Sequence, residues 1–146
     1  NGGGLLEQAV TVTSVFQTGV VTSTSGLHSP REELEATGPV ATKRPMVVLV
    51  NRFSASASEI VTGALKDHGR ATVIGTRTFG KGLVQTVVGL GNGSALKLTT
   101  AVYLTPDGTD INKKGIAPDI VAPDKPRTKK DETLQAALRY IARQER

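Results

Sequence analysis

A serine-rich segment, Ser54-Ala55-Ser56-Ala57-Ser58-Glu59, follows an apolar run and opens a stretch with helical spacing. A hydroxyl at such a strand-to-helix turn lies at the carboxyl end of a sheet, where α/β folds place their sites. Backbone N–H groups at the helix start would point toward a developing oxyanion, and small neighbours leave room for a substrate backbone. Ser56 is therefore a candidate nucleophile, although Ser56-x-x-Glu59 also has the spacing of a structural capping box.

A nucleophilic serine needs a base, and the sequence offers two histidines and one well-placed lysine. His68 ends the helix that Ser56 begins, about 18 Å away at the rise of an α-helix. His28 lies in a polar stretch with no element to fix it. A Ser-His-Asp triad is thus disfavoured, with His28 left open as an alternative.

Lys81 lies in the glycine-flanked segment Thr78-Phe79-Gly80-Lys81-Gly82, just past the strand that follows the Ser56 helix. Adjacent parallel strands would bring the carboxyl end of that strand beside the Ser56 turn. A lysine acts as a base only if its pKa falls well below the free value, and burial away from carboxylates does this. No acidic residue lies between Asp67 and Asp107. The alternative is a lysine in an ordinary surface turn.

The same segment resembles part of a phosphate-binding loop, because Gly75-x-x-x-x-Gly80-Lys81 matches most of that motif. The match fails at Gly82, where a Ser or Thr would bind Mg²⁺. It fails again because the residues from Leu83 onward have the pattern of a strand instead of a helix. Nucleotide binding remains a minor alternative.

The elements that must position these residues follow an α/β order with an antiparallel annex. The apolar run 46–50 is typical of a strand buried on both faces, and strand, helix, strand in sequence predicts a parallel crossover. Residues 24–44 predict a surface loop or ribbon, and Gly91-Asn92-Gly93 predicts a hairpin turn. The expected helices are 5–16, 57–68 and 131–143, and the expected strands are 20–22, 46–50, 71–75, 83–90 and 95–104.

The composition of the 146 residues excludes several classes of protein. There is no cysteine, which excludes disulfides, thiolate metal sites and a cysteine nucleophile. No stretch approaches the roughly 20 apolar residues of a membrane span. The net charge of +5 is concentrated toward the C-terminal end, but aromatic residues are only 3%, and Tyr140 is the one that lies among those charges. This pattern disfavours nucleic-acid binding.

Several ordered motifs together resemble the C-terminal processing (tail-specific) peptidases of the S41 family. The resemblance covers residues 1–122, and Gly2 departs from the family, which has proline or serine there. The matching motifs are Asn1-Gly2-Gly3-Gly4-Leu5, Asn51-x-x-Ser54-Ala55-Ser56-Ala57-Ser58-Glu59-Ile60, Gly63-Ala64-Leu65-x-Asp67, Arg77-Thr78-Phe79-Gly80-Lys81-Gly82-x-Val84-Gln85, Leu96-x-Leu98-Thr99-Thr100-Ala101-x-Tyr103-x-Thr105-Pro106-x-Gly108 and Gly115-Ile116-x-Pro118-Asp119.

This resemblance implies a crotonase-like α/β core and a serine endopeptidase with a Ser56/Lys81 dyad, needing no metal or cofactor. It implies that Gln85 orients the lysine, although a straight strand would separate Lys81 and Gln85 by about 13 Å. The oxyanion hole would be the backbone N–H groups of Ala57 and Gly3. Ser54 and Ser58 are expected to be turn and helix-cap residues.

The resemblance also bears on the organisation and setting of the parent protein. Residues 1–122 would be a partial catalytic core, incomplete at its N-terminal side, and residues 123–146 a linker and a final amphipathic helix. Nothing in the sequence corresponds to the family's PDZ domain, which captures the substrate tail. The implied partners are proteins with apolar C-terminal tails. The implied location is extracytoplasmic, in the periplasm, at the cell exterior or in the thylakoid lumen, with membrane association as an option for the parent protein. A non-catalytic binding member or an inactive fragment of the same fold is the main alternative.

Overall fold

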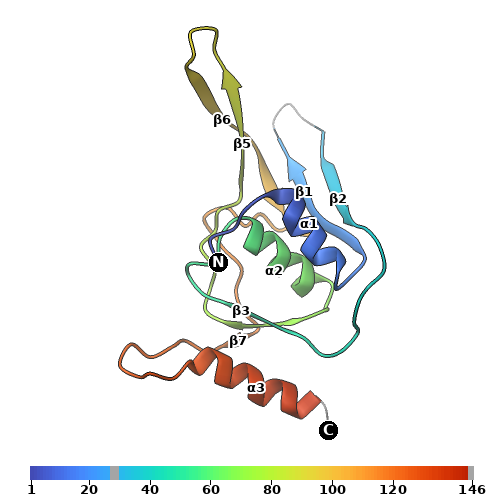
Figure 1. Ribbon diagram of the computed structural model, residues 1–146, viewed down its shortest axis with the longest axis vertical. Helices are drawn as coiled ribbons and strands as arrows, with labels where there is room; N and C mark the ends of the chain where they lie inside the picture. Colours follow the sequence, from blue (N-terminus) through green and yellow to red (C-terminus); the bar gives the residue numbers. More distant parts are fainter. Residues whose placement is uncertain (27–29, 145–146) are drawn as a thin grey trace.

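The chain folds into three helices and two β-sheets in the computed structural model, which describes residues 1–26 and 30–144 (Figure 1). Most of the expected elements are present with shifted ends. The elements are α1 (Leu6–Ser14), β1 (Gly19–Ser25), β2 (Glu32–Ala36), β3 (Val47–Val50), α2 (Ala57–Asp67), β4 (Thr72–Gly75), β5 (Leu83–Gly89), β6 (Ala95–Leu104), β7 (Ile120–Val121) and α3 (Glu132–Gln144).

One sheet is parallel and carries the predicted crossover. Its strand order is β3-β4-β7, with Val47 opposite Thr72 and Val50 opposite Gly75. The strand–helix–strand unit β3-α2-β4 is therefore parallel, as the sequence predicted. β7 was not predicted, because two residues are too few to show an alternating pattern.

The second sheet is antiparallel, with the order β2-β1-β6-β5. Residues 32–36 pair with β1, so the polar stretch 24–44 contains a ribbon. The predicted hairpin is confirmed as β5–β6, which Figure 1 shows extending away from the body of the molecule. Its pairing is irregular between Val84 and Gln85.

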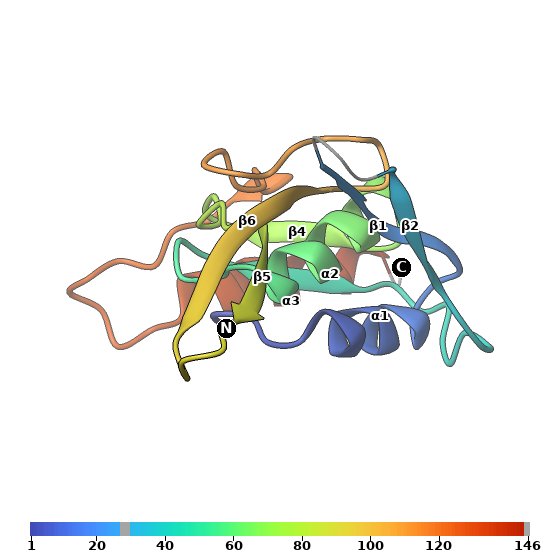
Figure 2. The ribbon, with the colours of Figure 1, turned by 90° about the horizontal axis from the view of Figure 1, so that it is seen from above.

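The helices α1 and α2 pack against each other and against the antiparallel sheet, as Figure 2 shows from above. The core between them is built from small and branched side chains: Ala9, Val21, Ala57, Ile60 and Ala64. The three from α2 recur at the spacing of one helical face. This face fixes how α2, and hence the turn that precedes it, sits on α1 and the antiparallel sheet.

The apolar strand β3 is not buried on both faces as the sequence predicted, and it is also an edge strand of the parallel sheet. Leu49 is 42% exposed, whereas Val50 is buried. A continuous apolar run carries no information about whether a strand has one neighbour or two.

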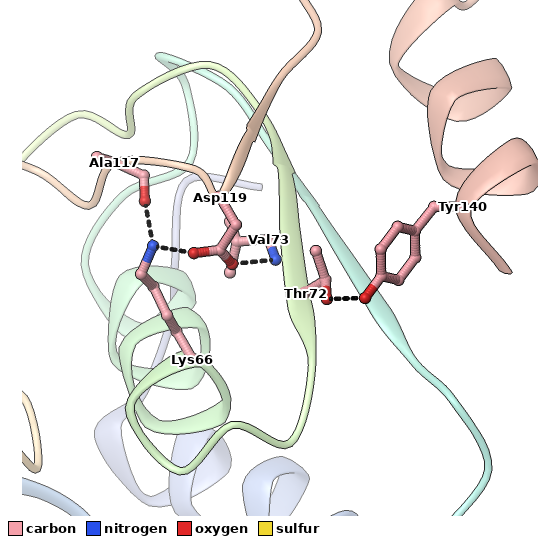
Figure 3. A network of polar contacts seen from close by, with 6 residues as sticks. All are labelled: Lys66, Thr72, Val73, Ala117, Asp119 and Tyr140. Atoms are coloured by element: carbon pink, nitrogen blue, oxygen red, sulfur yellow. Dashed lines mark hydrogen bonds and ion pairs between the residues drawn. The ribbon is translucent and has the colours of Figure 1, made fainter. Parts of the chain in front are cut away.

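The C-terminal helix α3 packs on the parallel sheet, against β3 and β4. The Tyr140 hydroxyl and the Thr72 hydroxyl form a hydrogen bond of 2.8 Å, drawn in Figure 3. At the other end of α3, the Thr133 hydroxyl donates to the Ala122 carbonyl at 2.6 Å. The final helix is thus part of the folded body. None of the helices in the described ranges is long and apolar enough to cross a membrane.

Candidate active site

Ser56 is the N-cap residue of α2 and follows the turn that leaves β3. The turn is closed by hydrogen bonds between Asn51 and Ser54: the Ser54 N–H donates to the Asn51 carbonyl at 2.8 Å, and the Asn51 N–H donates to the Ser54 hydroxyl at 3.1 Å. Ser54 is buried in this turn. The structure therefore places Ser54 as a turn residue and Ser56 at the mouth of the helix.

The backbone of Ser56 has φ 58° and ψ −124°. Positive φ is uncommon outside glycine, and among the described non-glycine residues only Ser56 and Lys113 adopt it. Such a conformation costs on the order of 1–3 kcal/mol and persists only where the surrounding structure enforces it. A serine held in this way on a strand-to-helix turn has the geometry that presents a nucleophile in other α/β folds.

The segment 78–82 that carries Lys81 is packed into the structure through its glycines. A Cβ on Gly80 would lie 2.8 Å from the Gly115 nitrogen, and one on Gly82 would lie 2.7 Å from the Asn112 nitrogen. The Phe79 N–H donates to the Ser54 carbonyl at 2.9 Å. The backbone of the lysine segment is thus seated beside the Ser56 turn, as predicted from the parallel strands.

Glu59 joins the two segments. It is completely buried, and its carboxylate accepts four hydrogen bonds. Oε2 accepts from the Ser56 N–H at 2.9 Å and from the Lys81 N–H at 2.8 Å. Oε1 accepts from the Thr78 hydroxyl at 2.5 Å and from the Gly80 N–H at 2.7 Å. Since one oxygen bonds both backbone nitrogens, Ser56 N and Lys81 N lie within about twice a hydrogen-bond length of each other.

Sequence reasoning assigned Glu59 only to a capping box. The Ser56 N–H bond is the Glu59 half of that box, so the local prediction holds in part. The bonds to the segment 78–82 were missed. The available signal in the sequence was a capping glutamate close to a candidate nucleophile. The spacing of the capping box alone does not tell a buried glutamate from an exposed one.

The side chain of Lys81 is exposed, so the expectation that burial would surround it is wrong for this chain. The hydrogen bonds of the described residues include none between the Ser56 hydroxyl and the Lys81 amine. The physical reason is that the packed glycines and Glu59 hold the backbone of the segment, while the lysine stem leaves it on the outer side. The structure brings the two backbones together without joining the two side-chain tips.

Gly3 packs directly on the Ser56 turn. Its φ is 96°, and a Cβ there would lie 2.6 Å from the Ala55 oxygen and 2.8 Å from the Ser56 Cβ. The Gly3 N–H donates to Asn1 Oδ1 at 3.0 Å. Ala57 is the first residue of α2, so its N–H has no partner within the helix. Both predicted oxyanion donors therefore lie at the turn. The Gly3 N–H is already hydrogen-bonded to the exposed Asn1 side chain.

A cavity of about 340 Å³ opens beside this turn, between α1, β3 and α2. Gly3 and Ala57 form part of its wall next to Ser56, and most of the remaining lining is aliphatic. The aliphatic part includes Val12, Leu49 and Val61. The chain thus offers an apolar recess immediately next to the candidate nucleophile.

The other candidates lie elsewhere. His68 is at the opposite end of α2 from Ser56, and its Nε2 is 2.7 Å from the Val20 carbonyl oxygen. His28 lies outside the described residues. Gln85 is exposed at the irregular position of β5, and no hydrogen bond to Lys81 is present. The residues after Gly82 form β5 instead of a helix, so the phosphate-loop context is absent.

The described residues include no group of three or more histidine, cysteine, aspartate or glutamate side chains that could hold a metal ion. Burial raises the pKa of Tyr103. For Asp119, burial alone would raise the pKa, but the Lys66 hydrogen bond, the Val73 N–H and the Lys66 charge together lower it (Figure 3).

A parallel α/β unit with a strained serine at a helix mouth and a glycine-held lysine beside it defines a hydrolase-like site. The model of peptidase family S41 matches residues 1–122, and the chain belongs to this family. It is 53% identical over 124 residues to a carboxy-terminal-processing protease of Bartonella bacilliformis. It is 47% identical over 122 residues to a chloroplastic C-terminal processing peptidase of Tetradesmus obliquus.

These matches cover 83% and 82% of the chain but only 29% and 26% of the two relatives, so the chain spans less than a third of their length. Among solved structures, the photosystem II D1 C-terminal processing protease aligns with a TM-score of 0.77 at 46% identity, covering 83% of this chain and 32% of that one. A lipoprotein of Streptococcus agalactiae aligns over 99% of this chain and 52% of its own, with a TM-score of 0.76 at 17% identity. That last likeness concerns the fold alone.

Proposed function

We propose that this chain carries the nucleophile segment of a serine endopeptidase that cleaves proteins near their C-termini. The observation that supports this best is the strained backbone of Ser56 at the mouth of α2, with Gly3 packed against the same turn. Relatives named as carboxy-terminal-processing proteases support the same reaction class.

In the proposed mechanism, the neutral Lys81 amine takes the proton of the Ser56 hydroxyl, and Oγ attacks the substrate carbonyl. The tetrahedral oxyanion accepts hydrogen bonds from the Ala57 and Gly3 N–H groups, the second after Asn1 Oδ1 moves away. The protonated lysine then gives its proton to the leaving amine. Water, deprotonated by Lys81, releases the acyl group and regenerates Ser56.

The exposed lysine tip must turn inward for this mechanism. Its backbone is already held close to Ser56 through Glu59, which supports a rotation of the long stem toward the hydroxyl. A polypeptide lying over the turn would exclude water from the space around the amine. Gln85 would orient the amine in that arrangement, with the irregularity of β5 redirecting its side chain.

The recess beside the Ser56 turn supports the proposed substrate class. An aliphatic cavity of about 340 Å³ suits apolar side chains near the cleaved bond, and proteins with apolar C-terminal tails are the proposed partners. We also propose a crotonase-like arrangement of the core, no metal or cofactor, and an extracytoplasmic location with membrane association of the parent protein. The chloroplastic and cyanobacterial relatives are consistent with that location.

A fluorophosphonate probe tests the proposal, because it reacts with activated serines. We expect mass spectrometry to place the label on Ser56, and Ser56→Ala to remove it. Ser58→Ala is a matched control that alters a neighbouring hydroxyl of the same segment and should keep the label. Labelling that persists in Ser56→Ala, or that never occurs in the parent chain, would refute Ser56 as nucleophile in this chain.

A second candidate function is a non-catalytic binding member of the same fold. The exposed Lys81 and the missing hydrogen bond to the Ser56 hydroxyl favour it. It predicts peptide binding in the apolar recess without any reaction at Ser56, which the probe experiment distinguishes.

A further inference from the structure

The residue that stands out from the described contacts is Glu59, a completely buried acid without a cationic partner. The ion pairs of the described residues involve other acids: Glu33, Asp119 and Asp110. A buried charge is costly unless it is paired or fully hydrogen-bonded. A capping role alone would not require its burial, because capping glutamates function at solvent-exposed helix starts.

The partners of Glu59 explain its burial. Three are backbone N–H groups, of Ser56, Gly80 and Lys81, and the fourth is the Thr78 hydroxyl. The Thr78 hydroxyl itself accepts from the Ile116 N–H at 2.7 Å, so its proton is free to point at Glu59. All four partners donate, and the carboxylate is the acceptor that satisfies them together.

These partners belong to two segments that lie far apart along the chain. One is the strained turn at Ser56, and the other is the glycine-flanked segment 78–82 with Lys81. Strain of the Ser56 kind persists only when the surroundings enforce it, and the Glu59 bond acts on the Ser56 N–H itself. The Lys81 N–H is held by the same oxygen atom.

We infer that Glu59 is a positioning residue for the reaction of Ser56. Its one carboxylate binds both the strained turn that presents Ser56 and the backbone from which the Lys81 side chain starts, and so fixes the position of one relative to the other. This inference rests on the proposed function for its catalytic consequence. Its structural part, the coupling of the two segments, can be measured without any reaction. Displacements of about 1 Å in such constellations cost on the order of a hundredfold in rate.

The first test is Glu59→Gln, which keeps the size of the side chain. An amide has only one accepting oxygen, so its NH₂ group must face two of the four donors. We expect the rate constant of fluorophosphonate labelling at Ser56, per folded molecule, to fall by about a hundredfold. Glu59→Asp keeps the charge and the N3 position, but its side chain is one methylene shorter. It should therefore retain the hydrogen bond to the Ser56 N–H and lose the hydrogen bonds to Thr78, Gly80 and Lys81.

A matched control separates positioning from general stability. Asp119 is another carboxylate that accepts a backbone N–H, from Val73 at 2.8 Å, but it lies away from the Ser56 turn. Asp119→Asn should lower the thermal stability while leaving the labelling rate per folded molecule unchanged. Equal labelling rates in wild type and folded Glu59→Gln, or an equal loss in Asp119→Asn, would overturn the inference.

The second test reads the coupling directly and covers the case in which Glu59→Gln does not fold. Thr78→Val removes one donor to Glu59, and with it the acceptor of the Ile116 N–H, but leaves the carboxylate in place. Thr78→Ser keeps the hydroxyl. We expect hydrogen exchange, followed by NMR, to be faster at the amides of both Gly80 and Ser56 in Thr78→Val and unchanged in Thr78→Ser. Unchanged exchange at Ser56 in Thr78→Val would overturn the coupling.

The two proposals fail in different ways. If wild type is not labelled, or if Ser56→Ala still is, the nucleophile assignment fails, while faster exchange at Ser56 in Thr78→Val would still support the coupling. If Ser56 is labelled at the same rate in wild type and folded Glu59→Gln, the nucleophile stands and the positioning role of Glu59 fails.

Discussion

The close approach of Gly3 to the Ser56 turn makes Gly3→Ala a sharp test of the proposed oxyanion hole. The added methyl carbon would lie 2.6 Å from the Ala55 oxygen, 2.8 Å from the Ser56 Cβ and 3.0 Å from the Ala57 nitrogen. The φ of 96° is also unfavourable for alanine. Neither the turn nor an alanine at this φ can adapt without movement, so the segment 1–4 must shift away from Ser56.

The magnitude follows from what that shift removes. Gly3 precedes α1 and lies outside the helices and strands, so the segment itself can relieve part of the strain, and the cost in folding stability should be about 1–2 kcal/mol. The loss of one oxyanion donor is much larger for the reaction, about 2.7–4 kcal/mol or 10²–10³ in rate. The variant should therefore fold almost as well as wild type and react far more slowly.

The assay is the second-order rate constant of fluorophosphonate labelling at Ser56, measured together with the thermal unfolding midpoint. Gly2→Ala and Gly4→Ala are matched controls in the same segment, because a Cβ at either position meets no atom within 4 Å. Both controls should keep the wild-type rate. If Gly3→Ala reacts as fast as Gly4→Ala, the Gly3 N–H is no part of the oxyanion hole and the reasoning is refuted.

Two further predictions concern charged side chains. Lys81→Ala should abolish labelling of Ser56 while changing the free energy of unfolding by at most about 0.5 kcal/mol, because the side chain is exposed; urea unfolding and the probe measure the two effects, and retained labelling would exclude Lys81 as the base. Asp119→Asn should cost about 1 kcal/mol at pH 7, discounted for the partial exposure of its ion pair with Lys66. Because the folded pKa of Asp119 is lowered, this contribution is complete above the ordinary carboxyl pKa and is lost as the pH falls through the folded value. Urea unfolding at pH 7 and at pH 3 should thus show the difference between wild type and Asp119→Asn shrinking in acid, and an undiminished difference at pH 3 would contradict it.

The local elements were predictable because their signals are local. The apolar spacing on α2, the run of β3 and the turn between β5 and β6 each depend on a few neighbouring residues. The parallel pairing of β3 and β4 followed from the order of elements. β7 and the edge position of β3 did not follow, since a two-residue strand has no period and an apolar run does not record its neighbours.

The amino-acid sequence by itself determined which residues could do chemistry: a serine at a helix start, a glycine-flanked lysine and a glycine-rich segment, in the motifs of one peptidase family. Only the tertiary structure decided how they meet. It gave Ser56 its strained backbone, left the Lys81 tip exposed and turned Glu59 from a local cap into a buried link between two segments. The reason is that burial and long-range hydrogen bonds depend on residues 19–22 positions apart, which no local spacing contains.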